Sequence, residues 1–346
     1  MEIDILNNKP AENINVVFKP MPGAEVQINV NGQSELKKYA IRVGSAESKT
    51  NFVSIDGANT ENGTTRNLTI SAADNKYGLE PVDIYGNNIT IKNCTIQARG
   101  TIYDNGTGIL LRNSLQVSEN CLIENNRITA INAILVGEDT LNVQKGNIIR
   151  NNELQFYLKG IYAYRVSDII IENNKIRGDL FDTYQLLPCY GIYSGTLRNN
   201  TGTVIISGNE ISNLGKNNGL TAGRRVRGIA VIGGGNYQID RNMIHDLYNA
   251  TTDTEAFQPS VFGIQISGGC TTSRYNIINN AIFGFKDKDN VSGRLGTIVT
   301  AGIETTTPGD VNLYFNSIYI GETDRDNHES YALYIGLGAK GSMIKS

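Results

Sequence analysis

Apolar and polar positions recur in a fixed order along most of the chain. A six-residue phrase of the form apolar, any, any, Asn, any, apolar reads IKNCTI, IENNRI, IRNNEL, IENNKI, ISGNEI and IDRNMI, with looser copies IINNAI and LYFNSI. The fourth position of the eight copies is Asn in seven of them. These positions are Cys94, Asn126, Asn152, Asn174, Asn209, Asn242, Asn280 and Asn316.

The copies lie 22 to 38 residues apart. This spacing is too irregular for leucine-rich, ankyrin or propeller repeats. A β-helix tolerates it, because one corner of a coil can bulge outward without disturbing the stack. The irregular period therefore predicts a solenoid of stacked β-coils.

A second phrase follows each copy and alternates apolar positions, as a half-buried strand does. It reads GILL (108–111), AILV (133–136), GIYA (160–163), GIYS (191–194), GIAV (228–231), GIQI (263–266), GIET (302–305) and ALYI (332–335). Each coil is therefore predicted to contain a strand, an Asn corner, a short strand, a second corner and a Gly-Ile strand.

Stacked coils lie about 4.8 Å apart, so equivalent Asn side chains can hydrogen-bond from coil to coil as a ladder. Asn also tolerates the left-handed backbone that such a corner needs. The inward Ile positions then form one apolar column. Ice-binding solenoids are also rich in Asn, but their flat rows of Thr are absent here.

The Asn ladder, the Ile column and the Gly-Ile strand resemble the pectate-lyase-like right-handed parallel β-helix superfamily. Residues 53–70 and 311–335 resemble β-helix repeat regions of secreted bacterial surface proteins, often exported by the type IX pathway. The resemblance implies an all-β fold, a single right-handed parallel β-helix of roughly ten coils. We expect one domain over 1–346, with an irregular coil or cap at 1–25 and a last incomplete coil at 323–346, as a fragment of a longer secreted protein.

Composition agrees with many tight corners, since the chain has 37 Gly, 7 Pro and no Trp. A net charge of −3 gives no electrostatic footprint for nucleic acid. No apolar run approaches the roughly 20 residues of a membrane-spanning helix. The four cysteines follow no metal-ligand spacing, and we expect isolated buried thiols.

Long coils carry their extra residues just before the Gly-Ile strand. If these insertions share one corner, they form a wall beside the Gly-Ile sheet, and repeat proteins often bind ligands at such loops. In the enzymes and tailspikes of the resembled superfamily, that sheet and wall bound the polysaccharide groove. The segments are 181–190, 216–227, 250–262, 286–301 and 323–331.

Outward positions of the Gly-Ile strand and charged residues of the wall are the candidate ligand contacts. Tyr offers a flat apolar face and a hydroxyl to a sugar ring, and clustered Arg can pair with uronate or sulfate. The alternatives are an ordinary solvated sheet and a solvated charged loop. The candidates are Tyr162, Tyr164, Tyr193, Arg224, Arg227, Gln265, Glu304 and Tyr334.

The sequence contains candidate catalytic residues but no complete catalytic motif of a known polysaccharide-cleaving enzyme. A glycosidase needs two carboxylates, about 5–5.5 Å apart for retention or roughly 6.5–9.5 Å for inversion. Glu304, Asp287 and Asp289 are the candidate carboxylates, and Arg225 is the candidate base of a lyase. The Asn-Thr-Asp, Asp-Asp and His-Gly motifs of polygalacturonases are absent.

His245 and Asp246 are adjacent on a predicted strand, so we expect them to point to opposite faces. No metal site or cofactor is predicted, and Ca²⁺ enters only under the lyase alternative.

Three functions remain open at this point. The first is a non-catalytic, extracellular module that binds polysaccharide at a bacterial surface. The second is a polysaccharide lyase or glycoside hydrolase that acts in the groove, and the third is a purely structural stalk. We expect a glycan partner, no nucleic acid, no membrane insertion, and a monomer whose uncapped end allows end-to-end stacking.

Overall fold

The computed structural model describes residues 3–5, 16–31, 39–73, 79–99, 106–113, 117–137, 142–179, 188–197, 200–215, 225–249, 260–287, 298–321, 328–336 and 344–345. None of these residues lies in a helix, and none of the strand pairings among them is antiparallel. The chain divides into two compact units. Unit 1 comprises 1–155 and 163–175, and unit 2 comprises 156–162 and 176–346.

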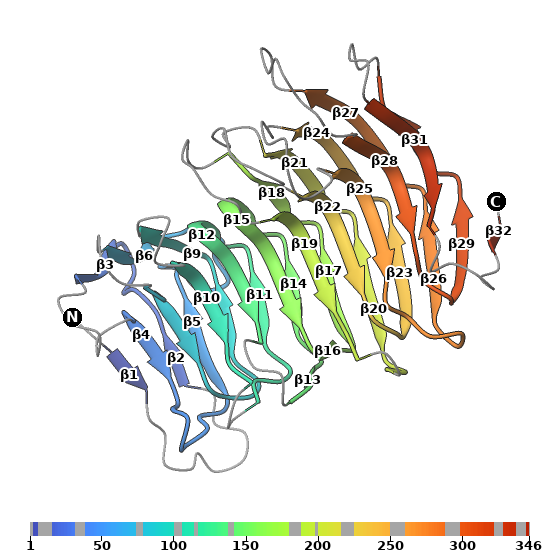
Figure 1. Ribbon diagram of the computed structural model, residues 1–346. Helices are drawn as coiled ribbons and strands as arrows, with labels where there is room; N and C mark the ends of the chain where they lie inside the picture. Colours follow the sequence, from blue (N-terminus) through green and yellow to red (C-terminus); the bar gives the residue numbers. More distant parts are fainter. Residues whose placement is uncertain are drawn as a thin grey trace. The chain divides into compact units, whose positions relative to one another are not determined.

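Each unit contains three strand rows, and a coil contributes one strand to each row. The first row holds the Gly-Ile strands, the second row precedes the Asn corner, and the third row follows it. Figure 1 shows the parallel strands of the rows. This is the predicted right-handed parallel β-helix fold.

In unit 1 the first row contains β1 (Ile3–Ile5), β4 (Ile41–Val43), β7 (Val82–Ile84) and β10 (Thr107–Leu111). The second row contains β2 (Val16–Phe18), β5 (Val53–Asp56), β8 (Thr90–Lys92), β11 (Leu122–Glu124), β14 (Ile148–Arg150) and β17 (Ile169–Glu172). The third row contains β3 (Val26–Asn31), β6 (Leu68–Ala73) and β9 (Cys94–Arg99). A short pair, β13 (Gln144–Lys145) and β16 (Val166–Ser167), lies outside the rows.

In unit 2 the first row contains β19 (Cys189–Gly195), β22 (Arg225–Ile232), β25 (Ser260–Ser267), β28 (Ile298–Thr305) and β31 (His328–Ile335). The second row contains β20 (Thr203–Ser207), β23 (Asn236–Asp240), β26 (Arg274–Ile278), β29 (Asp310–Tyr314) and β32 (Ile344–Lys345). The third row contains β21 (Glu210–Leu214), β24 (Met243–Asn249), β27 (Ala281–Asp287) and β30 (Ser317–Tyr319). Two strands of this β-helix, β15 (Glu153–Tyr164) and β18 (Lys175–Arg177), contribute residues to both units.

The corner predicted between the third and first rows is absent in one coil of unit 1. The strand β12 (Arg127–Val136) runs through it without a break. Its Ile128 pairs with Ile96 of β9, and its Ile134 pairs with Ile109 of β10. The two rows therefore join into one sheet at β12, because this short coil has no extra residues to form a turn.

The inward Ile positions stack as predicted. Ile28, Ile70, Ile96 and Ile128 follow one another in register in unit 1 and are buried. In unit 2 an equivalent column contains Ile211, Ile244, Ile282 and Ile318. Each buried Ile contributes about 2 kcal/mol of hydrophobic stabilisation, so this column forms the core.

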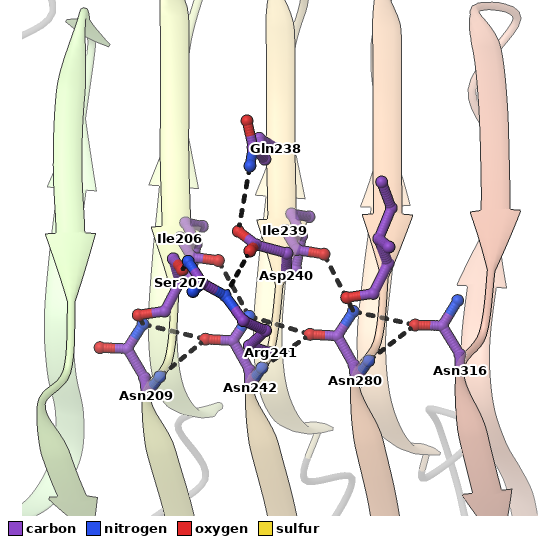
Figure 2. Close-up of polar contacts among 11 residues, drawn as sticks. Ile206, Ser207, Asn209, Gln238, Ile239, Asp240, Arg241, Asn242, Asn280 and Asn316 are labelled. Carbon is purple, nitrogen blue, oxygen red and sulfur yellow. Dashed lines mark hydrogen bonds and ion pairs between the residues drawn. The ribbon is translucent and has the colours of Figure 1, made fainter.

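The Asn ladder is also present. In unit 2, Oδ1 of Asn242 accepts hydrogen bonds from the backbone N–H and the side-chain amide of Asn209, both at 3.0 Å. Asn242 donates in the same way to Asn280, and Asn280 to Asn316 (Figure 2). In unit 1 the ladder connects Asn126, Asn152 and Asn174.

We predicted that the ladder Asn adopts the left-handed backbone of the corner. The structure instead has this conformation at the residue before the ladder Asn. Asn125, Asn151 and Asn173 have φ values of 51° to 56°. The ladder Asn must point its side chain inward, and the left-handed residue before it makes the bend. Arg241 and Phe315 occupy this position in unit 2, so it does not require Asn.

The strands near both ends of the chain pair within the rows, and most of the cysteines are buried. β1 and β2 lie within 1–25 and already pair with β4 and β5, while β31 and β32 pair with β28 and β29. Cys94, Cys121 and Cys189 are buried free thiols, as predicted, and Cys270 is half-buried. Burial raises the pKa of Cys121 to about 12, so this thiol is unreactive.

Candidate functional site

The outward side of the first row of unit 2 carries two columns of side chains in register. One column runs from Tyr193 through Ala230, Gln265 and Glu304 to Tyr334. The other runs from Tyr190 through Arg227, Phe262 and Ala301 to Tyr331. We call these two columns the first-row face.

A glycine between the two columns makes this face possible. A Cβ atom on Gly228 would lie 2.5 Å from Cγ2 of Ile244 and 2.5 Å from the carbonyl oxygen of Gly263. Gly191 and Gly263 are equally crowded. The Gly of the Gly-Ile phrase is therefore required for close packing against the inward Ile column.

Three tyrosines form an aromatic cluster at one end of the first-row face. The rings of Tyr162 and Tyr193 stack with centroids 4.3 Å apart and planes at 14°. Tyr190 meets Tyr193 edge to face at 5.3 Å, and the ammonium group of Lys159 lies 4.1 Å from the Tyr162 ring centroid. Tyr193 is buried, whereas Tyr162 and Tyr190 are partly exposed and can contact a ligand.

Arg227 of β22 is held in the middle of the face, with only 2% of its surface exposed. Its guanidinium donates to Oε1 of Gln265 at 2.8 Å, and to the carbonyl and hydroxyl oxygens of Ser260 at 2.7 Å each. The same group lies 4.0 Å from the Phe262 ring centroid. Burial lowers the pKa of Arg227 to about 9, which leaves it charged at neutral pH.

Glu304 of β28 is next to Gln265 in register and is 5% exposed. Its Oε2 atom is buried and has no hydrogen-bond partner among the described residues. Burial raises the pKa of Glu304, and the nearby Arg227 charge and a hydrogen bond with Gln265 only partly oppose this shift. A carboxyl group in this state can donate a proton or a hydrogen bond.

The structure thus brings several predicted residues together on one face: Tyr162, Tyr193, Arg227, Gln265, Glu304 and Tyr334. Arg227 was expected in a loop, but it lies within β22. Arg225 is exposed at the start of the same strand. Tyr164 ends β15 and belongs to unit 1.

Other predicted residues cannot be placed. Arg224 and Asp289 lie outside the described residues, as does most of the predicted wall, and the side chain of Asp287 at the end of β27 is not described. Their roles remain predictions.

Sequence reasoning missed Tyr190, Phe262 and Ser260. The signal was available for the first two, because both directly precede the Gly of a Gly-Ile phrase. That position lies outward, and the phrase was read only from the Gly onward.

The prediction for His245 and Asp246 was wrong. Their side chains meet, with Nδ1 of His245 2.8 Å from Oδ2 of Asp246. Asp246 has a φ of 53°, and the register skips it between Ser212↔His245 and Leu214↔Leu247. Asn213 occupies the equivalent position of β21 and also has a positive φ, so neither strand has an extra residue here. A left-handed bend shared by both strands turns the Asp246 side chain to the face that His245 occupies.

The described residues contain no group of three or more His, Cys, Asp or Glu placed to hold a metal ion. No helix long and apolar enough to cross a membrane occurs among them.

Residues 26–194 match a family model described as the right handed beta helix region. No curated protein sequence matches the chain.

Several solved structures resemble the chain at low sequence identity. The surface adhesin PfbA of Streptococcus pneumoniae is 13% identical with a TM-score of 0.45, over 96% of this chain and 83% of that one. The Agl-KA catalytic domain is 12% identical with a TM-score of 0.41, over 93% of this chain. The periplasmic alginate epimerase AlgG is 14% identical with a TM-score of 0.28, over 89% of this chain and 84% of that one. The chain spans 62% of the length of the Agl-KA domain.

Proposed function

Because the chain is a right-handed parallel β-helix protein, with a face of in-register outward side chains, we propose that it binds polysaccharide on the first-row face of unit 2. The observation that carries this proposal is the pairing of an aromatic cluster with a buried polar line across adjacent coils. The binding is non-catalytic in this proposal.

The aromatic cluster supplies the apolar part of such a site. Tyr162 and Tyr190 present ring surface and a hydroxyl, which suits the mixed polarity of a sugar ring. The stacked Tyr193 ring supports Tyr162 from beneath, so the platform is formed before a ligand arrives. A preformed platform lowers the entropy cost of binding.

The polar line supplies hydrogen bonds. Arg227 and Gln265 are fixed to each other and to Ser260. Glu304 has a buried oxygen without a hydrogen-bond partner among the described residues, and buried polar atoms normally have one. A hydroxyl group is chemically suited to this oxygen, because it can both donate and accept a hydrogen bond.

The test is a glycan array followed by affinity measurements on the saccharide that binds. We expect Tyr162→Ala to weaken binding about tenfold, through the loss of roughly 1–1.5 kcal/mol of ring contact. The matched control is Tyr319→Ala, since Tyr319 is a 71% exposed tyrosine of the third row. Binding that survives Tyr162→Ala and Tyr190→Ala together, or no binder on the array, would refute the proposal.

Glu304 also favours a second function, a polysaccharide hydrolase with this residue as general acid. Its raised pKa and unpartnered oxygen suit that role. The reaction needs a second carboxylate, for which Asp287 and Asp289 remain the candidates. Under a lyase mechanism Arg225 is the candidate base, with Ca²⁺ as an optional cofactor.

Turnover is measured by incubating neutral and uronate-containing polysaccharides with the protein and following reducing and unsaturated ends. A hydrolase predicts new reducing ends that disappear in Glu304→Gln. A lyase predicts unsaturated ends that disappear in Arg225→Ala. Activity that both variants retain would show that these residues are not the catalytic ones.

An extracellular or cell-surface location belongs to the same proposal, as does a monomeric state. A glycan-binding module at a bacterial surface can also serve as a stalk. Protease treatment of intact cells of the source bacterium tests the location, and a surface protein is degraded while a cytoplasmic marker survives.

A further inference from the structure

Unit 1 has a polar groove along its Asn corner, far in sequence from the first-row face. Its volume is about 810 Å³. No apolar side chain lines it, so an apolar ligand is excluded. The lining residues are Asn62, Gly63, Thr64, Arg66, Lys92, Asn93, Glu124, Asn125, Arg127 and Asn151.

The floor of the groove is an outer row of asparagine amides. Asn93, Asn125 and Asn151 are the left-handed residues that precede the ladder positions. The amide of Asn125 donates to Oδ1 of Asn93 at 2.7 Å, and Asn93 donates in turn to Asp56 at 2.7 Å. Successive amides are one coil apart, about 4.8 Å. Both N–H groups of Asn93 and of Asn125 already donate within the protein, so these two residues offer their amide oxygens to a ligand.

One wall of the groove is the segment 57–67 between β5 and β6, and it is tied to the floor. Arg66 donates to the backbone oxygen and to Oδ1 of Asn125, at 2.9 and 3.0 Å. The amide of Asn125 donates to the carbonyl oxygen of Thr64 at 3.1 Å. The groove is therefore formed without a ligand.

Charge in the groove is unevenly compensated. Arg66 and Arg127 each bond to a different oxygen of Glu153, both at 3.0 Å, so two guanidinium groups share one carboxylate. Burial alone would raise the pKa of Glu153, but hydrogen bonds from both arginines outweigh it and hold that pKa below its usual value. Glu153 is thus ionised at neutral pH and still leaves one positive charge unmatched.

Arg127 is the cation that a ligand can reach. Its side chain is 59% exposed, and only its Nε atom donates to a described residue. Lys92 is a second cation of the groove, 3.4 Å from Asp56, and Glu124 is bound by Arg150 at 2.8 Å. The terminal nitrogens of Arg127 can therefore form a charge-assisted pair with a carboxylate.

We propose that this groove binds an acidic oligosaccharide, with a uronate carboxylate on Arg127 and sugar hydroxyls on the Asn amides. The amide oxygens suit sugar hydroxyl groups, because a hydroxyl can donate a hydrogen bond to each of them. The site lies at a different corner and in a different unit from the first-row face, so it is a second glycan site and does not depend on the first.

The experiment is calorimetric titration of the whole chain with tetragalacturonate and with its carboxyl-reduced, neutral counterpart. We expect the acid to bind and the neutral tetramer to bind at least about tenfold more weakly, since one charge-assisted pair contributes about 1.5–3 kcal/mol. Arg127→Gln should weaken tetragalacturonate binding by about the same factor.

Two variants keep this test specific. Arg177→Gln is the matched control, because Arg177 is 58% exposed and pairs with Asp179 as Arg127 pairs with Glu153. Tyr162→Ala removes the first-row platform and therefore reports any tetragalacturonate bound at that face, separately from the groove. Absence of binding, an equal effect of Arg177→Gln, or loss in Tyr162→Ala but not in Arg127→Gln would overturn the groove proposal. The last result would support the first-row face instead.

Discussion

At the residue scale, asparagine fills two different positions at the corners 125–126, 151–152 and 173–174. The ladder residue satisfies backbone groups of neighbouring coils from inside, and the residue before it adopts the left-handed bend. Asn152 shows the first job, since its Oδ1 accepts from two nitrogens of Asn126, and its amide donates to the carbonyl oxygen of Ile123.

Replacing Asn152 with Ala should lower the free energy of unfolding by about 3 kcal/mol, because it removes the acceptor of the buried backbone N–H and side-chain amide of Asn126 and a donor to the carbonyl of Ile123. Urea unfolding measures the change. The matched control is Asn151→Gly, which keeps the left-handed bend at an exposed site and should change stability by less than about 0.5 kcal/mol. Equal losses in the two variants would mean that the ladder adds nothing.

Glu304 should make stability depend on pH in a defined direction. Its pKa is raised by burial, so folding favours the protonated form. The contribution of Glu304 to the free energy of unfolding is fully present below the carboxyl pKa of the unfolded chain. This contribution is lost as the pH rises through the raised pKa of the folded chain. Glu304→Gln should therefore melt at a higher temperature than the native chain at pH 7 and at a similar temperature near pH 4. A variant that melts lower at pH 7 would contradict the assignment.

The prediction of the Asn ladder was correct because its pattern repeats along the chain. The predictions that depended on the backbone angle of one residue, at the corner and at Asp246, were wrong. Seven Asn in eight equivalent positions identified the ladder. The left-handed bend at Asp246 had a sequence signal that was missed, because Asn213, Asp246 and Gly284 hold equivalent positions of three coils and all three residue types tolerate a positive φ. The left-handed position was misassigned by one residue because Asn-Asn pairs such as 151–152 offer two candidates.

At the element scale, the Gly-Ile strand sets both the packing of the core and the first-row face. Its register was predictable because the phrase recurs, and Gln265 and Glu304 were placed in adjacent coils on that basis. The aromatic platform was only half predicted, since Tyr190 lies one residue before the phrase.

Gly263→Ala tests this element. Its Cβ would lie 2.5 Å from Cγ2 of Ile282 and 2.6 Å from the carbonyl oxygen of Gly302. We expect a loss of about 3 kcal/mol from overpacking, measured by urea unfolding. Ala332→Gly, at the equivalent and exposed position of β31, should cost less than about 1 kcal/mol. A Gly263→Ala variant as stable as the native chain would show that the coils can move apart.

At the scale of the whole molecule, each unit carries its own candidate for glycan contact. The first-row face of unit 2 is aromatic and polar, and the groove of unit 1 is amide-rich with surplus positive charge. The sequence predicted the first and missed the second. Arg66 and Glu153 are 87 residues apart in the chain, and their side chains meet only in the folded solenoid. A pattern read along the sequence therefore does not reveal the pair.

The most direct test of the account is a crystal structure of the chain with the saccharide selected on the array. We predict a sugar ring over Tyr162 and Tyr190, with a hydroxyl group bonded to Oε2 of Glu304. A saccharide bound at another surface, with the first-row face empty, would contradict the proposed function.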